Sequence, residues 1–296
     1  MTFEKWQALE NDYLIIEQEQ LAFELNPARV RRLCDPHSGV GTDGVLLLAP
    51  PRDRADAADL RIFNPDGTEA ELSGNGARQA LLYLRRRGWT DSDSFSIHTA
   101  AGRIAATITG EFACRVDMGN ARLQSDDFPG GPADGRAELE VAGSPPWRFQ
   151  HVSIGNPQCA IHVPGRQELD ALDLGAIGPP IEGHPAFPNR TNVSWYTELD
   201  AGGPARIRAR IFERGVGETR SSGTGACGAA VAYLLASPGR SEQARTAAGE
   251  VTVELDGGEL EVAVDADLRV ALSGWALPVF AGRLDDQLLA ELRRAA

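Results

Sequence analysis

Two glycine-rich segments of this 296-residue chain carry a serine in the same place. LSGNGA spans residues 72–77 and SSGTGA spans residues 221–226, so Ser73 and Ser222 each stand directly before a Gly-x-Gly sequence. A serine before a helix accepts a hydrogen bond from a first-turn amide, and the remaining amides of that turn attract anions. Each segment alone is typical of a helix cap, and the pair also fits two halves of one carboxylate-binding site.

The two segments belong to an internal repeat. Shifted by 149 positions, RIFNPDGTEAELSGNGA (61–77) aligns without a gap with RIFERGVGETRSSGTGA (210–226). Eight of the seventeen columns are identical, where unrelated segments would share about one or two. The identical pairs include Arg61/Arg210, Glu69/Glu218 and Ser73/Ser222. Because the offset is half the chain, we expect two domains with the same internal architecture.

Each copy predicts a strand, a turn and a helix. In the first copy we expect a strand over 60–63, a turn over 64–67, and a helix over 75–87 that ends at Gly88. The second helix, over 224–236, contains no charged residue and should therefore be buried on every side. Most of the remaining chain reads as strands, which favours two sheet-rich halves, each curled around one central helix.

The repeated helix starts suit a particular chemistry. If both point at one carboxylate, Ser73 and Ser222 flank the carbon that carries it, and glycines let the backbone approach closely. Inversion at a carbon requires one group that removes a proton from one face and a second group that supplies a proton to the other. The pattern therefore indicates proton transfer at a carbon beside a carboxylate.

Composition argues against several other functions. A net charge of −13 and a pI near 4.9 disfavour nucleic acid and anionic membranes as partners. The first residues carry early acids and no apolar run, so we expect a cytoplasmic protein without a membrane span.

Cofactor motifs are also missing from the sequence. The four cysteines are widely spaced, as in reduced, buried thiols, and the histidines show no metal-ligand spacing. GTGACG (223–228) formally matches a dinucleotide-binding motif, but the preceding strand is not adjacent and the first copy lacks the third glycine. We therefore expect no metal and no cofactor.

Several further motifs resemble one known family. NPDGTEAELSGNGAR, HTAAGRI, VSIGNPQCAIHV, FPNRTNVSW and ERGVGETRSSGTGAC together resemble diaminopimelate epimerase along essentially the whole chain. The resemblance implies interconversion of LL- and meso-diaminopimelate, a small amino diacid, without pyridoxal phosphate, metal or nicotinamide. It also implies an α+β fold of two pseudo-symmetric domains, each a mostly antiparallel curled sheet around a central buried helix, with the substrate between them. We place the domains at 1–120 plus 272–296 and at 121–271, and a homodimer is compatible with the sequence.

The resemblance also assigns roles to individual residues. It implies catalytic positions at Ser73, Ser222, Glu213 and Gln158. It implies that substrate is bound by Asn11, Asn64, Gly74, Asn75, Asn156, Asn192, Arg214, Gly223 and Thr224. Among these, Arg214 suits a remote carboxylate because its guanidinium forms paired hydrogen bonds.

The chain differs from the family at the residues that would carry out the proton transfer. The family has a cysteine at each serine position and a histidine at the position of Gln158. A thiol ionises near pKa ~8.5 and an alkoxide near water's ~15.7, so serine raises the cost of forming the base by at most about 10 kcal/mol. That is about a million-fold or more in rate if nothing compensates.

Three interpretations remain open. The chain is an epimerase-type isomerase with serine at both thiol positions, or a relative that performs other proton-transfer chemistry such as allylic isomerisation or dehydration. The third is a catalytically silent protein that binds an amino diacid.

Overall fold

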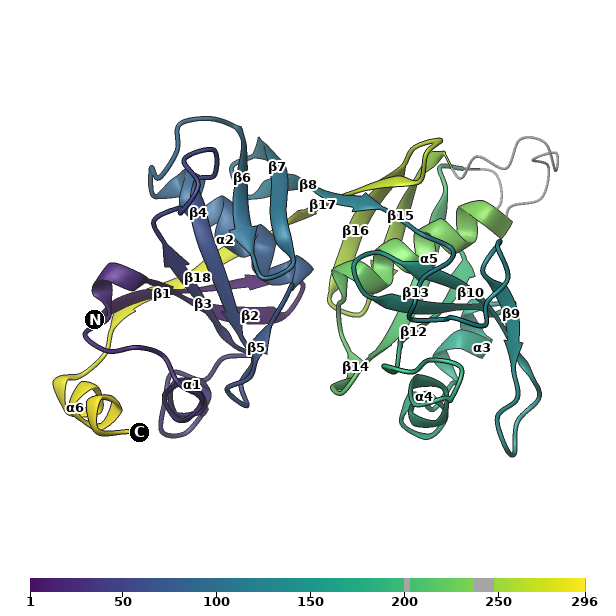
Figure 1. Ribbon diagram of the computed structural model, residues 1–296, viewed down its shortest axis with the longest axis horizontal. Helices are drawn as coiled ribbons and strands as arrows, with labels where there is room; N and C mark the ends of the chain where they lie inside the picture. The colour runs from purple at the N-terminus through teal and green to yellow at the C-terminus, as the bar shows by residue number, and fades with distance from the viewer. Residues whose placement is uncertain (200–202, 237–247, 296) are drawn as a thin grey trace. The chain divides into compact units, whose positions relative to one another are not determined.

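The computed structural model describes residues 1–199, 203–236 and 248–295 (Figure 1). Contacts between Cα atoms divide the chain into unit 1, Met1–Val116 with Gly274–Ala296, and unit 2, Asp117–Ser273. The bounds expected from the sequence, after residue 120 and before residue 272, differ slightly from these. Each unit is rich in strands and contains one helix buried by its sheet, which confirms the expected α+β fold.

Unit 1 is a curled sheet with helix α2 (Gly74–Arg86) against its inner face (Figure 1). Its strands pair in the order β18-β1-β2-β3-β4-β6-β7-β8, and the short β5 also pairs with β4. The pairs β2/β3 and β4/β6 are parallel, and the chain between their strands contains α1 and α2 respectively. The other elements are β1 (Thr2–Ala8), β2 (Asn11–Glu17), η1 (Gln18–Gln20), α1 (Pro27–Cys34), β3 (Val45–Ala49), β4 (Ala58–Phe63), β5 (Glu69–Ala70), β6 (Ser94–Thr99), β7 (Gly102–Gly110), β8 (Ala113–Asn120), β18 (Leu277–Arg283) and α6 (Asp286–Arg294).

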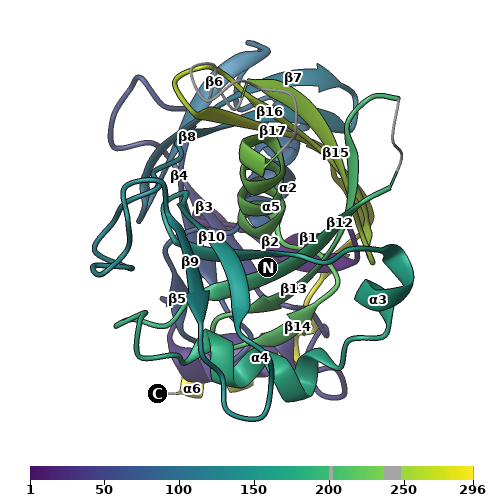
Figure 2. The ribbon, with the colours of Figure 1, turned by 90° about the vertical axis from the view of Figure 1, so that its right-hand side faces the viewer.

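Unit 2 repeats this topology around helix α5 (Gly223–Ala236), which Figure 2 shows inside its curled sheet. Its strands pair in the order β9-β10-β11-β12-β13-β15-β16-β17, and β14 pairs with β13. The parallel pairs β11/β12 and β13/β15 stand where β2/β3 and β4/β6 stand in unit 1. The other elements are β9 (Arg136–Leu139), β10 (Trp147–Ser153), β11 (Pro157–His162), α3 (Arg166–Asp170), α4 (Leu174–Glu182), β12 (Asn192–Glu198), β13 (Arg206–Glu213), β14 (Gly217–Thr219), β15 (Gly249–Leu255), β16 (Gly258–Val264) and β17 (Arg269–Trp275).

The internal repeat is visible in individual contacts. Arg61 binds Glu69 across β4 and β5 at 2.9 and 2.7 Å, and Arg210 binds Glu218 across β13 and β14 at 3.0 and 2.7 Å. The two strand pairs also have the same register, because Phe63 faces Glu69 and Phe212 faces Glu218. The sequence identities at these positions therefore record a shared strand-turn-strand geometry.

The central helices are buried as their sequences predict. In α5, residues 223–232 and 234 are buried, as expected of a helix without a charged side chain. Helix α2 is buried from Gly74 to Leu84, and Gly88 after it has a left-handed φ of 73°. Both helices begin one residue before the expected position, a difference within the usual uncertainty of helix ends.

The strands beside α2 are buried on both faces, because a helix covers each side. Successive side chains of a strand point to opposite faces. Leu14 and Ile16 of β2 therefore join a core cluster with Leu33 of α1 and Leu292 of α6. On the other face, Leu46 of β3 packs against α2. Such two-sided burial explains the continuous apolar runs YLIIE and VLLLA.

All four cysteines are buried, and none of them forms a disulfide bond. Burial raises the pKa of Cys34 and Cys114 to about 12, and it raises that of Cys159 well above its ordinary value of 9.0. These three thiols are therefore protonated at neutral pH. Within the described ranges, no helix is long and apolar enough to span a membrane.

Gly44 allows three elements to approach closely. A Cβ added there would lie 2.4 Å from the Phe63 carbonyl oxygen of β4 and 2.6 Å from Cε1 of the Tyr13 ring of β2. We predict that Gly44→Ala lowers the free energy of unfolding by about 1–3 kcal/mol, because the added methyl group overpacks a site bounded by backbone. Urea denaturation measures this change. Gly130→Ala, at a position where the methyl group meets open space, is the control, and equal effects of the two would contradict the packing.

Candidate active site

The two repeated helices begin in the same way. Ser73 caps α2 by accepting a hydrogen bond from the Gly76 amide at 3.0 Å, and Ser222 accepts one from the Gly225 amide of α5 at 3.2 Å. The capping role therefore holds for both serines. It leaves the amides of Gly74, Asn75, Gly223 and Thr224 in first turns, where they have no partner within the helix. First-turn amides attract anions, so we call each helix start a candidate half-site.

Glu213 supplies a carboxylate to the half-site of unit 2. It ends β13, and its side chain accepts a hydrogen bond from the Thr219 hydroxyl at 2.7 Å. Burial raises the pKa of Glu213 above its ordinary value of 4.5, and the hydrogen bonds from Thr219 and Ser222 offset part of that rise. A carboxyl group in this state is suited to exchange protons with the Ser222 hydroxyl.

Gln158 and Asn156 join the same half-site from another side. The Gln158 amide donates to Asn156 Oδ1 at 2.7 Å, and the Asn156 amide donates to the Thr224 hydroxyl at 3.2 Å. Gln158 lies against α5, because a Cβ added at Gly228 of that helix would be 2.8 Å from the Cβ of Gln158. Its Oε1 is buried and has no hydrogen-bond partner among the described residues. Gln158 therefore presents an acceptor, although its amide cannot act as a base.

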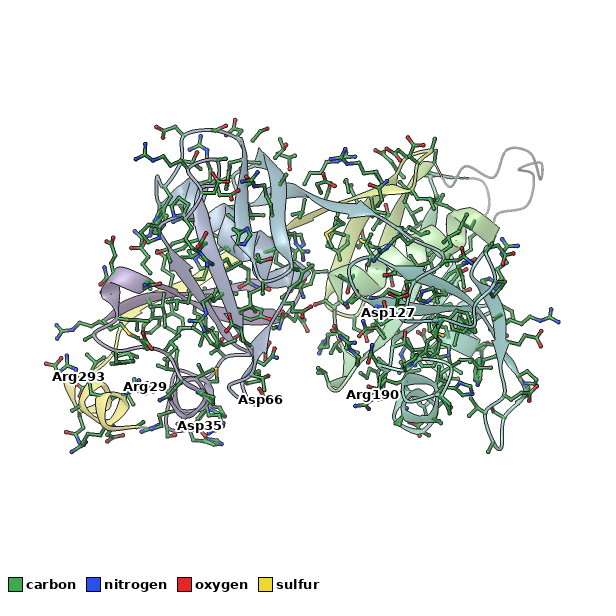
Figure 3. All side chains as sticks on the ribbon, viewed as in Figure 1. Arg29, Asp35, Asp66, Asp127, Arg190 and Arg293 are labelled. Atoms are coloured by element: carbon green, nitrogen blue, oxygen red, sulfur yellow. The ribbon has the colours of Figure 1, made fainter. Side chains whose placement is uncertain are left out.

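Arg214 lies on a turn that is fixed at its backbone. The Asn192 side chain accepts a hydrogen bond from the Arg214 amide at 2.8 Å, and the buried Glu182 accepts one from the Gly215 amide at 2.8 Å. Glu182 also pairs with Arg190, which Figure 3 labels beside α4. Gly215 has a φ of 75°, as expected for the third residue of a type II turn. The turn leaves the Arg214 side chain exposed.

The half-site of unit 1 is organised around α2. The buried Asn75 accepts a hydrogen bond from Arg78 at 2.6 Å, and Gln79 donates to the backbone carbonyl of Asn11 at 3.0 Å. The side chain of Asn11 itself donates to Asp43 at 3.0 Å. The contact with Gln79 places Asn11 beside the central helix.

Asn64 lies in the turn between β4 and β5, where Figure 3 labels Asp66. Its side chain donates to the Thr68 hydroxyl at 3.0 Å, so it stabilises this turn. The turn closes through the Gly67 amide and the Asn64 carbonyl at 2.9 Å, as the Asn-Pro-Asp-Gly sequence predicts. Asn64 stands 149 positions before Glu213, so unit 1 carries an amide where unit 2 carries a carboxylate.

Comparison with known proteins decides the family. The family model described as "Diaminopimelate epimerase" matches residues 3–124 and 150–274. The diaminopimelate epimerase of Synechococcus sp. (strain JA-2-3B'a(2-13)) is 40% identical over 290 residues, covering 95% of this chain and 97% of the relative. That of Pelotomaculum thermopropionicum is 40% identical over 291 residues, covering 95% and 98%. The chain belongs to the diaminopimelate epimerase family.

Solved structures with the same fold extend beyond the diaminopimelate epimerase family. The Bacillus anthracis phenazine biosynthesis protein of the PhzF family has a TM-score of 0.65 and 18% identity, covering 96% of this chain and 99% of that one. A probable proline racemase from Agrobacterium radiobacter K84 has a TM-score of 0.66 and 16% identity, covering 96% and 93%. At these identities the likeness shows the shared fold alone.

Sequence reasoning missed three residues around this epimerase-family site. Tyr13 donates a hydrogen bond to Ser73 at 3.2 Å, Thr219 binds Glu213, and Glu182 fixes the turn of Arg214. Thr219 lies inside the quoted ERGVGET motif, whereas Tyr13 and Glu182 lie 60 and 33 residues from their partners. Across the parts of the chain that the structure describes, no group of three or more His, Cys, Asp or Glu side chains could hold a metal ion.

The raised pKa of Glu213 predicts how stability depends on pH. The folded chain binds this proton more tightly than the unfolded chain, so the stabilisation is complete below pH ~4.5 and is lost as pH rises through the folded-state pKa. Glu213→Gln removes this titration. We therefore expect the difference in melting temperature, variant minus wild type, to increase between about pH 4 and about pH 8. The exposed Glu261 provides the control variant Glu261→Gln, and a difference for Glu213→Gln that is flat or falls with pH would refute the assignment.

Proposed function

We propose that this chain binds diaminopimelate and transfers protons at its α-carbon without a cofactor. The two relatives at 40% identity are named diaminopimelate epimerase. The observation that carries the proposal is the start of α5, where Ser222 caps the helix beside Glu213, a carboxyl group whose pKa is raised by burial. It combines a proton acceptor, a hydroxyl group and a helix start that attracts a carboxylate.

The first-turn amides provide the electrostatic part of the proposed reaction. Gly74 and Asn75 of α2, with Gly223 and Thr224 of α5, would bind the carboxylate next to the reacting carbon. Removing the α-proton places negative charge on that carboxylate, and amides already oriented toward it stabilise the charge without reorganising. This stabilisation makes the α-proton more acidic, which partly offsets the poor basicity of serine.

Unit 2 would supply the base. As Ser222 Oγ takes the α-proton, its own hydroxyl proton passes to Glu213, so that the serine hydroxyl is re-formed and Glu213 becomes protonated. The C–H bond and the original O–H bond of Ser222 break, new O–H bonds form at Ser222 and Glu213, and the electron pair of the C–H bond remains on the substrate. Glu213 thereby avoids the full cost of a serine alkoxide.

The remaining polar residues would hold the substrate. Oε1 of Gln158 offers a buried acceptor for an ammonium group, and Asn156 lies next to it. The exposed Arg214 offers its guanidinium to the remote carboxylate, while Asn192 fixes its backbone. We assign Asn11 and Asn64 to the same substrate from unit 1. We further propose that the reaction takes place in the cytoplasm, with no nucleic acid or membrane as partner.

One observation favours a second candidate function. Because Asn64 stands where unit 2 has Glu213, the carboxylate is present on one side only. A reaction in which one base both removes and returns a proton, such as an allylic isomerisation, needs no second carboxylate. Inversion of the α-carbon in the test below would argue against this candidate.

Isotope exchange tests the proposed function. Wild-type protein in deuterium oxide should replace the α-proton of LL-diaminopimelate with deuterium and form the meso isomer slowly. The variant Ser73→Cys/Ser222→Cys should be at least about 100-fold faster, because a thiol ionises much more readily than a hydroxyl. NMR spectroscopy and chiral chromatography measure both processes, and Ser221→Cys is the control for introducing a neighbouring thiol. Binding without exchange in wild type and in the double variant would favour the silent binding protein.

The assignment of Arg214 is tested by affinity. Arg214→Gln should weaken the binding of diaminopimelate at least about ten-fold in calorimetry, which corresponds to about 1.4 kcal/mol. Arg148→Gln, which removes another exposed guanidinium of unit 2 paired with Glu138, should leave the affinity unchanged. Equal affinities of the two variants would remove Arg214 from the site.

A further inference from the structure

Tyr13 is the titratable side chain that contacts Ser73 in unit 1. Its hydroxyl donates a hydrogen bond to Ser73 Oγ at 3.2 Å, and the tyrosine is only 6% exposed. The ring lies against the backbone of Gly44, where a Cβ would be 2.6 Å from Cε1 and 3.0 Å from Cδ1. The ring therefore has little freedom to turn its hydroxyl away from Ser73.

Both serines accept a hydrogen bond from a first-turn amide, but their other polar neighbours differ. Ser73 Oγ accepts from both the Gly76 amide and the Tyr13 hydroxyl, so its own proton is directed toward another acceptor. Ser222 Oγ accepts from the Gly225 amide and lies near Glu213, a carboxyl group whose pKa the Ser222 hydroxyl lowers. Ser73 is thus arranged to donate a proton, whereas Ser222 is arranged to receive one.

We propose that Tyr13 is the proton-relay partner of Ser73, so that unit 1 delivers a proton to the substrate while Glu213 and Ser222 remove one. The inference rests on the proposed function. When Ser73 gives its proton to the α-carbon, it takes the Tyr13 proton. A C–H bond forms, the phenol O–H bond breaks, and Tyr13 is left as phenolate. Together with proton removal at Ser222, one proton leaves carbon for Glu213 and one reaches carbon from Tyr13, and exchange with solvent resets both residues.

A phenol is well suited to this relay. A phenol ordinarily ionises near pKa ~10, so it keeps its proton at neutral pH until Ser73 requires one. Phenolate is easier to form than a serine alkoxide by several pKa units. Placing the residual charge on Tyr13 rather than on Ser73 therefore removes most of the penalty that serine would otherwise impose. In the reverse direction the phenolate takes the proton back through Ser73.

Tyr13→Phe tests the relay by removing only the hydroxyl. We expect kcat for epimerisation to fall at least about 100-fold, within the range of general acid–base effects, with KM changed less than about two-fold. Exchange of the α-proton without inversion should persist, because Glu213 and Ser222 are intact. Tyr83→Phe is the matched control: Tyr83 is also a buried tyrosine of unit 1, and its hydroxyl donates to Glu17 at 2.8 Å rather than to Ser73.

A thiol at position 73 shows whether Tyr13→Phe lowers kcat by removing the relay or by disturbing the packing. In a Ser73→Cys background the thiol ionises without help, so Tyr13→Phe should lower kcat less than about five-fold. An equal loss in both backgrounds, or no loss in the serine background, would overturn the relay while leaving the proposed function intact. Failure of the wild-type chain to bind diaminopimelate or exchange its α-proton would instead overturn the proposed function, and the relay with it.

Discussion

The first-turn amides at the starts of two buried helices are the constraint on which the rest of the molecule depends. These N–H groups lack a carbonyl partner one turn earlier in the helix, so polar groups outside the helix backbone must satisfy them. Ser73 and Ser222 each satisfy one such amide. The neighbouring glycines let the backbone come close to whatever occupies the remaining positions. The fold therefore produces two anion-attracting points before any catalytic side chain is added.

Around these two points the units share a backbone but differ in chemistry. The Arg–Glu pairs of β4/β5 and β13/β14 have the same register and similar distances. The polar neighbours of the two serines do not correspond: Ser222 lies near a carboxyl group of β13 whose pKa its hydroxyl lowers, and Ser73 accepts a hydrogen bond from a phenol of β2. A duplicated scaffold thus carries two unlike proton partners. This difference is what a reaction with separate acid and base roles requires.

Much of this architecture could be predicted from the sequence, because the relevant signals are local or repeated. The lack of charge in TGACGAAVAYLLA predicted a helix buried on all sides, and Asn64-Pro65-Asp66-Gly67 predicted its turn. The site could be predicted only in part. The quoted motifs contain Glu213, Gln158 and Thr224, but the contact of Tyr13 with Ser73 joins residues 60 positions apart. In the sequence, Tyr13 is the first residue of the apolar run YLIIE and carries no sign of a catalytic role. Only the folded chain shows where its hydroxyl points.

The arrangement of sulfur in the chain has a physiological consequence. The four cysteines are buried in the cores, and the two helix starts carry oxygen instead. Peroxides and alkylating agents attack accessible thiolates, and a pair of facing thiols can close into a disulfide. The proposed site, with its hydroxyl, phenol and carboxyl groups, offers no such target. Oxidative stress that silences a thiol-dependent catalyst would leave these groups unmodified.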